Sequence, residues 1–218
     1  MYKKIKTLFF PLAKLAFNTY NLKPRNYTYK GITVRVNKQV FPPQFTISTK
    51  LLLEFLDTLP LQHKTFLELG CGSGIVSLYA ASKDAIVTAT DINKIAVELL
   101  KIAAKNNNLE LDVLYSDLFE NIKHLHFDYI IINPPYYPKN PKNTKEQAWF
   151  CGENFEYFVR LFSELNTHIA NHTYMILSED CDINYIKKIA NNQQIQLNLI
   201  QEKTVLKEEN YIFKIVKI

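Results

Sequence analysis

The stretch FLELGCGSGIV, residues 66–76, carries three of the 5 glycines of this 218-residue chain, at positions 70, 72 and 74. It begins as an apolar run and leads into a second run with helical spacing. Glycine tolerates positive φ and lets the backbone approach a ligand, and a helix N-terminus offers unpaired N–H groups to an anion. A tight structural turn would need only one glycine, so the stretch predicts a strand, a ligand-binding loop and a helix.

Short apolar runs alternate with helical patterns through most of the chain. The strand-like runs are residues 65–69, 85–91, 111–117, 127–133 and 173–178, and the helical stretches lie near 74–82, 93–106, 153–170 and 182–191. This alternation predicts βαβ units, with a parallel sheet covered by helices on both faces. Two last apolar runs, 195–201 and 210–218, have only a polar linker between them and are expected to pair as an antiparallel hairpin on the sheet edge.

The region before the glycine loop has a different pattern. Residues 27–36 alternate around Gly31 in the manner of two short strands and a turn. Residues 48–59 have a Ser/Thr start and apolar positions at helical spacing, which predicts a helix. We therefore expect residues 1–45 to form an N-terminal helix and a short β-hairpin cap, followed by one main domain over residues 46–218.

The composition and the N-terminal pattern limit the kinds of protein that this chain can be. With 47% hydrophobic residues and a formal net charge of +5, the chain is typical of a globular protein and compatible with a polyanionic partner. The basic and apolar start is interrupted at Pro11 and Lys14, and no run of 18 apolar residues occurs, so we expect neither a signal peptide nor a membrane span. The scattered Cys71, Cys151 and Cys181 indicate free thiols in a cytoplasmic protein, without a metal site.

An acidic residue stands where a nucleotide-binding βαβ unit places one. Asp91 ends the strand-like run after the glycine loop, 21 positions beyond Gly70, and could accept hydrogen bonds from ribose hydroxyls or lie solvated at a strand end. The Gly-x-Gly-x-Gly spacing differs from the Gly-x-Gly-x-x-Gly of dinucleotide-binding proteins. It resembles instead, as E-L-G-C-G-S-G, the first motif of class I S-adenosylmethionine-dependent methyltransferases.

That resemblance implies a fold, a cofactor and a set of site residues. The fold is a Rossmann-like seven-stranded sheet, mostly parallel with an antiparallel C-terminal strand pair and flanked by helices. The cofactor is S-adenosylmethionine, held at its methionine end by the glycine loop, at its ribose by Asp91 and near its adenine by Asp117. The implied cofactor-binding residues are Glu68, Gly70, Cys71, Gly72, Gly74, Asp91, Ile92, Asp117, Leu118 and Asn133.

A second stretch, FDYIIINPPYYP at residues 127–138, indicates the chemistry. Two prolines end the strand and fix the loop, which holds Asn133 at the carboxyl end of the strand. A planar nitrogen is a poor nucleophile, and the Asn133 carboxamide oxygen and the Pro134 carbonyl could each accept one of its N–H groups, orient it and stabilise its developing positive charge. Tyr136 offers a face to a flat substrate group. A proline-rich turn capped by an asparagine is the structural alternative.

The sequence N-P-P-Y resembles the signature of methyltransferases that modify a glutamine side-chain amide or the exocyclic amine of adenine. Carried over, Asn133, Pro134, Pro135 and Tyr136 are the implied catalytic residues. AWFCGENFEYFVRLF, residues 148–162, is similar to A-W-x-G-G-x-x-G and its following helix in HemK-like enzymes, which act on translation release factors, although Cys151 and Phe155 replace glycines. The resemblance implies a glutamine amide in a protein, such as a release factor, as the methyl acceptor.

Two other readings stay open. An RNA or DNA base amine is the alternative acceptor, because a phosphate-binding rim could be formed by PKNPKNTK, residues 138–145, and by Lys3, Lys4, Lys6, Lys14, Lys23, Arg25 and Lys30. Interspersed lysines also serve solubility alone. A non-catalytic cofactor- or partner-binding module is the third reading, which the two intact motifs disfavour. His124 and His126 are expected to face solvent rather than bind a metal.

Overall fold

The computed structural model describes residues 24–218 except 38 and 41. The helix expected near the N-terminus, and Lys3, Lys4, Lys6, Lys14 and Lys23, lie outside the described residues. Within the described range the alternation of strands and helices follows the predicted order.

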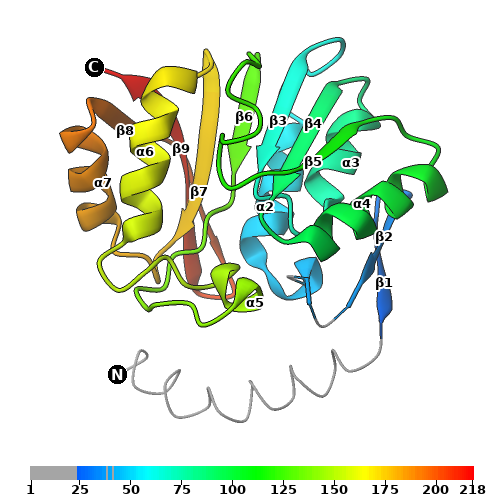
Figure 1. Cartoon of the computed structure of the whole chain (residues 1–218), viewed down its shortest axis with the longest axis horizontal. Helices are drawn as coiled ribbons and strands as arrows, with labels where there is room; N and C mark the ends of the chain where they lie inside the picture. The colour runs from blue at the N-terminus through cyan, green and yellow to red at the C-terminus, as the bar shows by residue number, and fades with distance from the viewer. Residues whose placement is uncertain (1–23, 38, 41) are drawn as a thin grey trace.

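The centre of the fold is a seven-stranded sheet of order β5-β4-β3-β6-β7-β9-β8 (Figure 1). The strands are β3 Thr65–Leu69, β4 Ile86–Asp91, β5 Asp112–Tyr115, β6 Tyr129–Ile132, β7 His172–Ser178, β8 Ile195–Val205 and β9 Glu208–Lys217. The five strands from β3 to β7 pair in parallel, whereas β9 is antiparallel to both β7 and β8. This confirms the predicted mostly parallel sheet with an antiparallel C-terminal pair.

Helices cover both faces of the sheet (Figure 1). One face packs against α2 Ile47–Leu56, α3 Ile75–Ala81 and α4 Lys94–Asn106, and the other against α6 Glu156–His168 and α7 Ile183–Asn192. Successive strand residues point to opposite faces, so Phe66 lies in the first core and Leu67 in the second. Because both faces are buried, the central strands read as continuous apolar runs in the sequence.

The predicted N-terminal hairpin is formed by β1 Arg25–Tyr29 and β2 Ile32–Val36, and a 3₁₀ turn, η1 Pro43–Phe45, precedes α2. Asn107, just after α4, fixes this hairpin to the main fold. Its Oδ1 accepts a hydrogen bond from the Thr33 N–H at 2.9 Å, and its Nδ2 donates to the Thr33 carbonyl at 2.7 Å. The hairpin thus packs on the helical layer, and the division into a cap over 1–45 and a domain over 46–218 stays a prediction.

The C-terminal hairpin is longer than expected, and the predicted polar linker between its strands is wrong. β8 and β9 pair almost to the turn, which consists of Leu206 and Lys207, both with positive φ (51° and 68°). Positive φ at both central residues matches the backbone twist of a two-residue hairpin, but Asn-Gly usually supplies it. Residues 202–204 of β8 are polar and exposed on the edge strand of the sheet, so they carry no apolar signal.

Candidate active site

A cavity of about 430 Å³ opens at the carboxyl ends of β3, β4 and β6, where both sequence motifs meet. Its walls include every residue predicted to belong to the site except Gly74. The Gly74 backbone has φ +74° at the N-terminus of α3, and a Cβ there would lie 2.3 Å from Leu100 Cδ1 of α4. This glycine therefore permits close packing of α3 on α4, while the other predicted residues face the cavity.

The glycine loop is hydrogen-bonded to the end of the neighbouring strand, β4. The N–H groups of Gly70 and Cys71 both donate to the Thr90 carbonyl, at 2.9 and 2.8 Å. The next N–H in the loop, that of Gly72, donates to the Asp91 carboxylate at 2.7 Å. The loop and the end of β4 consequently form one hydrogen-bonded unit on the cavity wall.

Asp91 is the acidic centre of that unit. Its second carboxylate oxygen accepts the Asn93 N–H at 2.7 Å, so each oxygen holds one backbone donor. Burial raises the pKa of Asp91, and these two hydrogen bonds oppose that rise. A carboxylate oxygen has two lone pairs, so Asp91 keeps acceptor capacity toward the cavity. This arrangement is suited to hydroxyl donors such as those of a ribose.

Glu68 is a second acid on the same wall, on β3 before the glycines. Its Oε2 accepts hydrogen bonds from the Ser77 N–H, at 2.8 Å, and from the Ser77 hydroxyl. Burial raises the pKa of Glu68 to about 8, although the two Ser77 hydrogen bonds oppose this. Within the described part of the chain Glu68 has no cationic partner, so a ligand that brings its own positive charge would favour the ionised form of this side chain.

A third acid, Asp117, stands in the loop after β5. Arg160 of α6 places its Nη2 atom 3.0 Å from Asp117 Oδ2 and 3.6 Å from Glu164 Oε1. The next residue, Leu118, is buried with positive φ of 48°, and its carbonyl accepts the Ser116 hydroxyl at 2.8 Å. The sequence prediction missed Arg160, which lines the cavity and ties α6 to the loop that carries Asp117.

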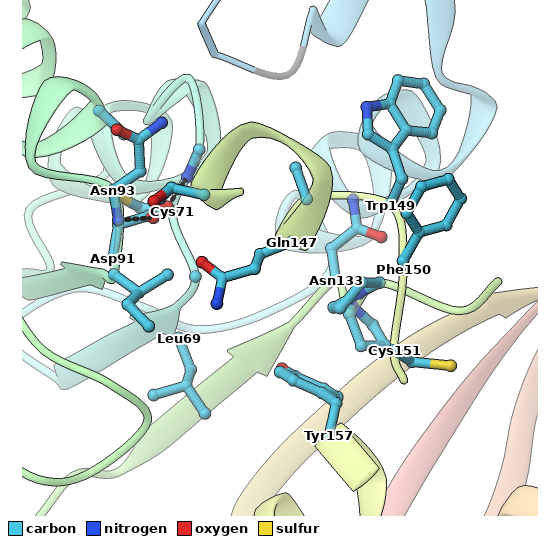
Figure 2. A pocket seen from close by; sticks show the side chains of 18 of the residues that line it. Leu69, Cys71, Asp91, Asn93, Asn133, Gln147, Trp149, Phe150, Cys151 and Tyr157 are labelled. Carbon is cyan, nitrogen blue, oxygen red and sulfur yellow. Dashed lines mark hydrogen bonds between the residues drawn. The ribbon is translucent and has the colours of Figure 1, made fainter. Parts of the chain in front are cut away.

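Asn133 stands directly after β6, on the opposite side of the cavity from the glycine loop (Figure 2). Its Nδ2 lies 3.5 Å from Ser48 Oγ of α2, a long hydrogen bond in which the amide donates. The Oδ1 atom is therefore left as the acceptor for another group. Tyr136 lines the cavity and packs against the second core, where burial raises its pKa to about 12 and keeps the phenol protonated.

The chain after N-P-P-Y returns to form the outer wall. The Tyr137 N–H donates to the Trp149 carbonyl at 3.1 Å, and the Cys151 N–H donates to the Tyr137 carbonyl at 3.0 Å. Between these residues lies a short helix, α5 Thr144–Gln147, which the sequence did not predict. Figure 2 shows Trp149 and Phe150 beside Asn133, while the Gln147 side chain extends into the cavity from the same segment.

Sequence reasoning thus missed the wall residues that come from distant or irregular segments. They are Ser48 and Thr49 of α2, Gln147 of α5, Phe150 of the segment after α5, and Arg160 of α6. The similarity of residues 148–162 to A-W-x-G-G-x-x-G pointed to this segment without assigning positions. Only the structure brings α2 and α6 to the same cavity.

Three further predictions concern the histidines, a metal or membrane-spanning role, and the cysteine thiols. His124 and His126 are exposed, as expected. The described residues contain no cluster of His, Cys, Asp or Glu arranged to hold a metal ion, and no described helix has the length and apolarity needed to cross a bilayer. Cys71, Cys151 and Cys181 are buried free thiols, and burial raises the pKa of each.

Comparison with known families gives a match over the same region. Residues 31–150, more than half of the chain, match the family model described as methyltransferase small domain. The fold is similar to that of a solved structure, a T. thermophilus 16S rRNA N2 G1207 methyltransferase in complex with AdoMet and guanosine, with a TM-score of 0.64 and 17% identity over 88% of this chain and 50% of that one. This likeness concerns the fold.

Curated relatives are similar over parts of their length. A Methanocaldococcus jannaschii protein bearing the name of a protein N5-glutamine methyltransferase is 39% identical over 50% of this chain and 53% of its own. An Aquifex aeolicus release factor glutamine methyltransferase is 27% identical over 79% of this chain and 66% of its own. A Buchnera aphidicola ribosomal RNA small subunit methyltransferase C is 37% identical over 44% and 29%. The chain therefore spans less than two thirds of each of these relatives.

Proposed function

The chain belongs to the methyltransferase small domain family, and we propose that it transfers a methyl group from S-adenosylmethionine to the side-chain amide nitrogen of a glutamine in a protein, such as a translation release factor. The proposal rests chiefly on Asn133, whose amide nitrogen is directed to Ser48 so that its oxygen is available to an acceptor nitrogen. The relatives named for glutamine methylation support this acceptor.

The acids of the cavity fit S-adenosylmethionine. Asp91 retains lone pairs for ribose hydroxyls, Asp117 can accept from an adenine amine, and the buried Glu68 suits the positive end of the molecule. Gly70, Cys71 and Gly72 border the same space without large side chains, and Ile92 and Leu118 add apolar walls. When bound, this cofactor supplies an electrophilic methyl group on a sulfonium, which needs no metal to activate its leaving group.

The residues of the N-P-P-Y loop would hold the acceptor. A carboxamide nitrogen has its lone pair delocalised, so its orientation governs its reactivity. Asn133 Oδ1 and the Pro134 carbonyl each accept one N–H, and both oxygens stabilise the positive charge that develops on the nitrogen. Pro134 and Pro135 restrict the loop backbone, and Tyr136 packs beside the acceptor from a fixed position against the core.

The direct test is methyl transfer to a purified release factor from radiolabelled S-adenosylmethionine, with wild-type protein and Asn133→Ala compared at equal concentration. We expect label that survives denaturing gel purification and locates to one glutamine by peptide mass analysis. Label elsewhere, or equal label with the variant, would contradict the proposal. A host RNA fraction is incubated in parallel.

An RNA base amine is the second candidate, favoured by a specific surface. Lys139, Lys142 and Lys145 are exposed in the segment whose Asn140, Pro141 and Thr144 line the cavity. Lys50 is exposed on α2, the helix that contributes the buried Ser48 to the cavity wall. Such a rim can neutralise backbone phosphates, and one relative is named for ribosomal RNA methylation. Label in RNA alone would select this candidate, and binding would then weaken steeply with added salt.

A further inference from the structure

The side chain of Gln147 occupies the cavity between the two halves of the proposed site. Figure 2 shows its carboxamide in the space between Asn133 on one side and the glycine-loop wall with Cys71 and Asp91 on the other. Among the described residues, this carboxamide has no hydrogen-bond partner. An amide with one acceptor and two donors in that position is available to whatever enters the cavity.

The segment that carries Gln147 is held in place by its own hydrogen bonds. Asn143 caps α5 by accepting the Glu146 N–H at 3.1 Å, and the Glu146 carboxylate accepts the Lys142 N–H at 2.8 Å. The N–H groups of Trp149 and Phe150 both donate to the Glu146 carbonyl at 3.0 Å. The position of Gln147 in the cavity is therefore set by the backbone around it.

This wall is also coupled to the N-P-P-Y loop. Tyr137, the residue after the motif, pairs through its backbone with Trp149 and Cys151, in the segment between α5 and α6. Tyr137 Oη in turn donates to Asp180 Oδ2 at 3.3 Å, which ties the loop to the end of β7. A shift of α5 that withdrew Gln147 would be transmitted to the backbone beside Asn133.

Gln147 carries the same functional group as the proposed methyl acceptor. The proposed acceptor is a glutamine side-chain amide, and the chain already directs a glutamine side-chain amide of its own into the same cavity. The two carboxamides have identical donors, acceptors and size, so they would compete for the space between Asn133 and the glycine-loop wall, into which Gln147 extends. We propose that Gln147 is an internal mimic of the acceptor, which occupies the acceptor position in the free enzyme and is displaced by the substrate glutamine.

This inference rests on the proposed function and makes a kinetic prediction. A residue that blocks the binding-competent state raises the apparent substrate KM by the inverse of the open fraction. If Gln147 fills the position about nine tenths of the time, Gln147→Ala lowers the KM for a glutamine-bearing protein about tenfold and leaves kcat unchanged. The KM of Gln147→Asn, whose amide is on a shorter side chain, should lie between the KM of the wild type and that of Gln147→Ala.

The test measures KM and kcat for a glutamine-bearing release factor at saturating S-adenosylmethionine, and the dissociation constant of the same factor by calorimetry without S-adenosylmethionine. Gln196→Ala, the same truncation of a glutamine at an exposed position of β8 outside the cavity, is the matched control. A lower KM and tighter binding in Gln147→Ala alone would support the mimic.

A KM that is unchanged or higher in Gln147→Ala, with thermal unfolding like that of the wild type, would overturn the mimic and assign Gln147 to wall structure or substrate contact. Failure of the proposed function has a different signature, because the wild-type protein would then place no label on glutamine in any protein. The calorimetric comparison still decides whether Gln147 opposes binding of the factor in that case.

Discussion

The carboxylate of Asp91 accepts the backbone N–H of Gly72 at 2.7 Å, so the acid after β4 and the glycine loop after β3 are parts of one structure. The two motifs lie on different strands, which are neighbours in the sheet. Removing the carboxylate therefore removes a candidate ligand group and also a support of the loop. This double role governs what substitution of Asp91 should do.

Asp91→Ala should weaken S-adenosylmethionine binding and lower the free energy of unfolding. The N–H groups of Gly72 and Asn93 lose their acceptor, and a lost hydrogen bond to a charged group costs about 1.5–3 kcal/mol. Calorimetry measures the affinity, and urea unfolding measures the stability. Asp112→Ala, at the exposed start of β5, is the control. Affinity equal to that of the wild type would show that the ribose contact lies elsewhere.

Gly74→Ala should destabilise the fold through two separable costs. The φ of +74° is unfavourable for a residue with a Cβ by about 1–2 kcal/mol, and that Cβ would meet the Leu100 side chain at 2.3 Å. Gly31→Ala is a matched control, because its φ is +86° and nothing lies within 4 Å of the added Cβ.

The steric part can be isolated with Leu100→Ala. In that background, Gly74→Ala should cost about as much as Gly31→Ala does in the wild type, because the clashing side chain is gone. Chemical unfolding of the wild type, Gly74→Ala, Leu100→Ala and the double variant gives the coupling energy between the two positions. Costs that simply add would mean that α3 and α4 separate to absorb the methyl group.

Glu68→Gln should change how stability depends on pH. The Glu68 pKa is about 8 in the folded protein against a usual value of 4.5, so between these values the folded state keeps a proton that the unfolded state has lost. The contribution of Glu68 therefore lowers the free energy of unfolding as pH rises from about 4.5 to 8, and is constant above that. Glutamine cannot titrate, so this loss disappears.

The measurement is urea unfolding of ligand-free protein at several pH values from about 5 to about 8.5. The difference in stability between Glu68→Gln and wild type should grow in favour of the variant across this range. Glu98→Gln, on the exposed face of α4, controls for the loss of one negative charge. Parallel curves for Glu68→Gln and wild type would contradict the raised pKa.

The sheet and the place of the site could be read from the sequence for a shared physical reason. Parallel strands buried on both faces give uninterrupted apolar runs, and their carboxyl ends lie at one edge. Motifs that each follow such a run, at Gly70, Asp91 and Asn133, therefore meet in space although dozens of residues separate them. The structure confirms that these three motifs line one cavity.

The missed parts lack a local signal. Ser48 lies 85 residues before its partner Asn133, and Arg160 reaches Asp117 from a helix on the other side of the loop. Serine and arginine are common at exposed helix positions, so their residue types do not indicate a site. Only tertiary packing places them at the cavity. The Leu206–Lys207 turn was missed for another reason, because its positive φ values fall on residues that rarely adopt them.

Asn133→Ala should abolish methyl transfer and leave S-adenosylmethionine binding nearly unchanged, because the lost oxygen faces the acceptor while Glu68, Asp91 and Asp117 remain. Loss of one such preorganised polar group costs about 10²- to 10³-fold in kcat. Ser48→Ala is the informative companion, since it removes the hydroxyl 3.5 Å from Asn133 Nδ2 but keeps the acceptor oxygen. We expect it to reduce kcat far less than Asn133→Ala does. Equal loss of transfer and of cofactor affinity in Asn133→Ala, measured by label transfer and calorimetry, would remove the proposed role of this residue.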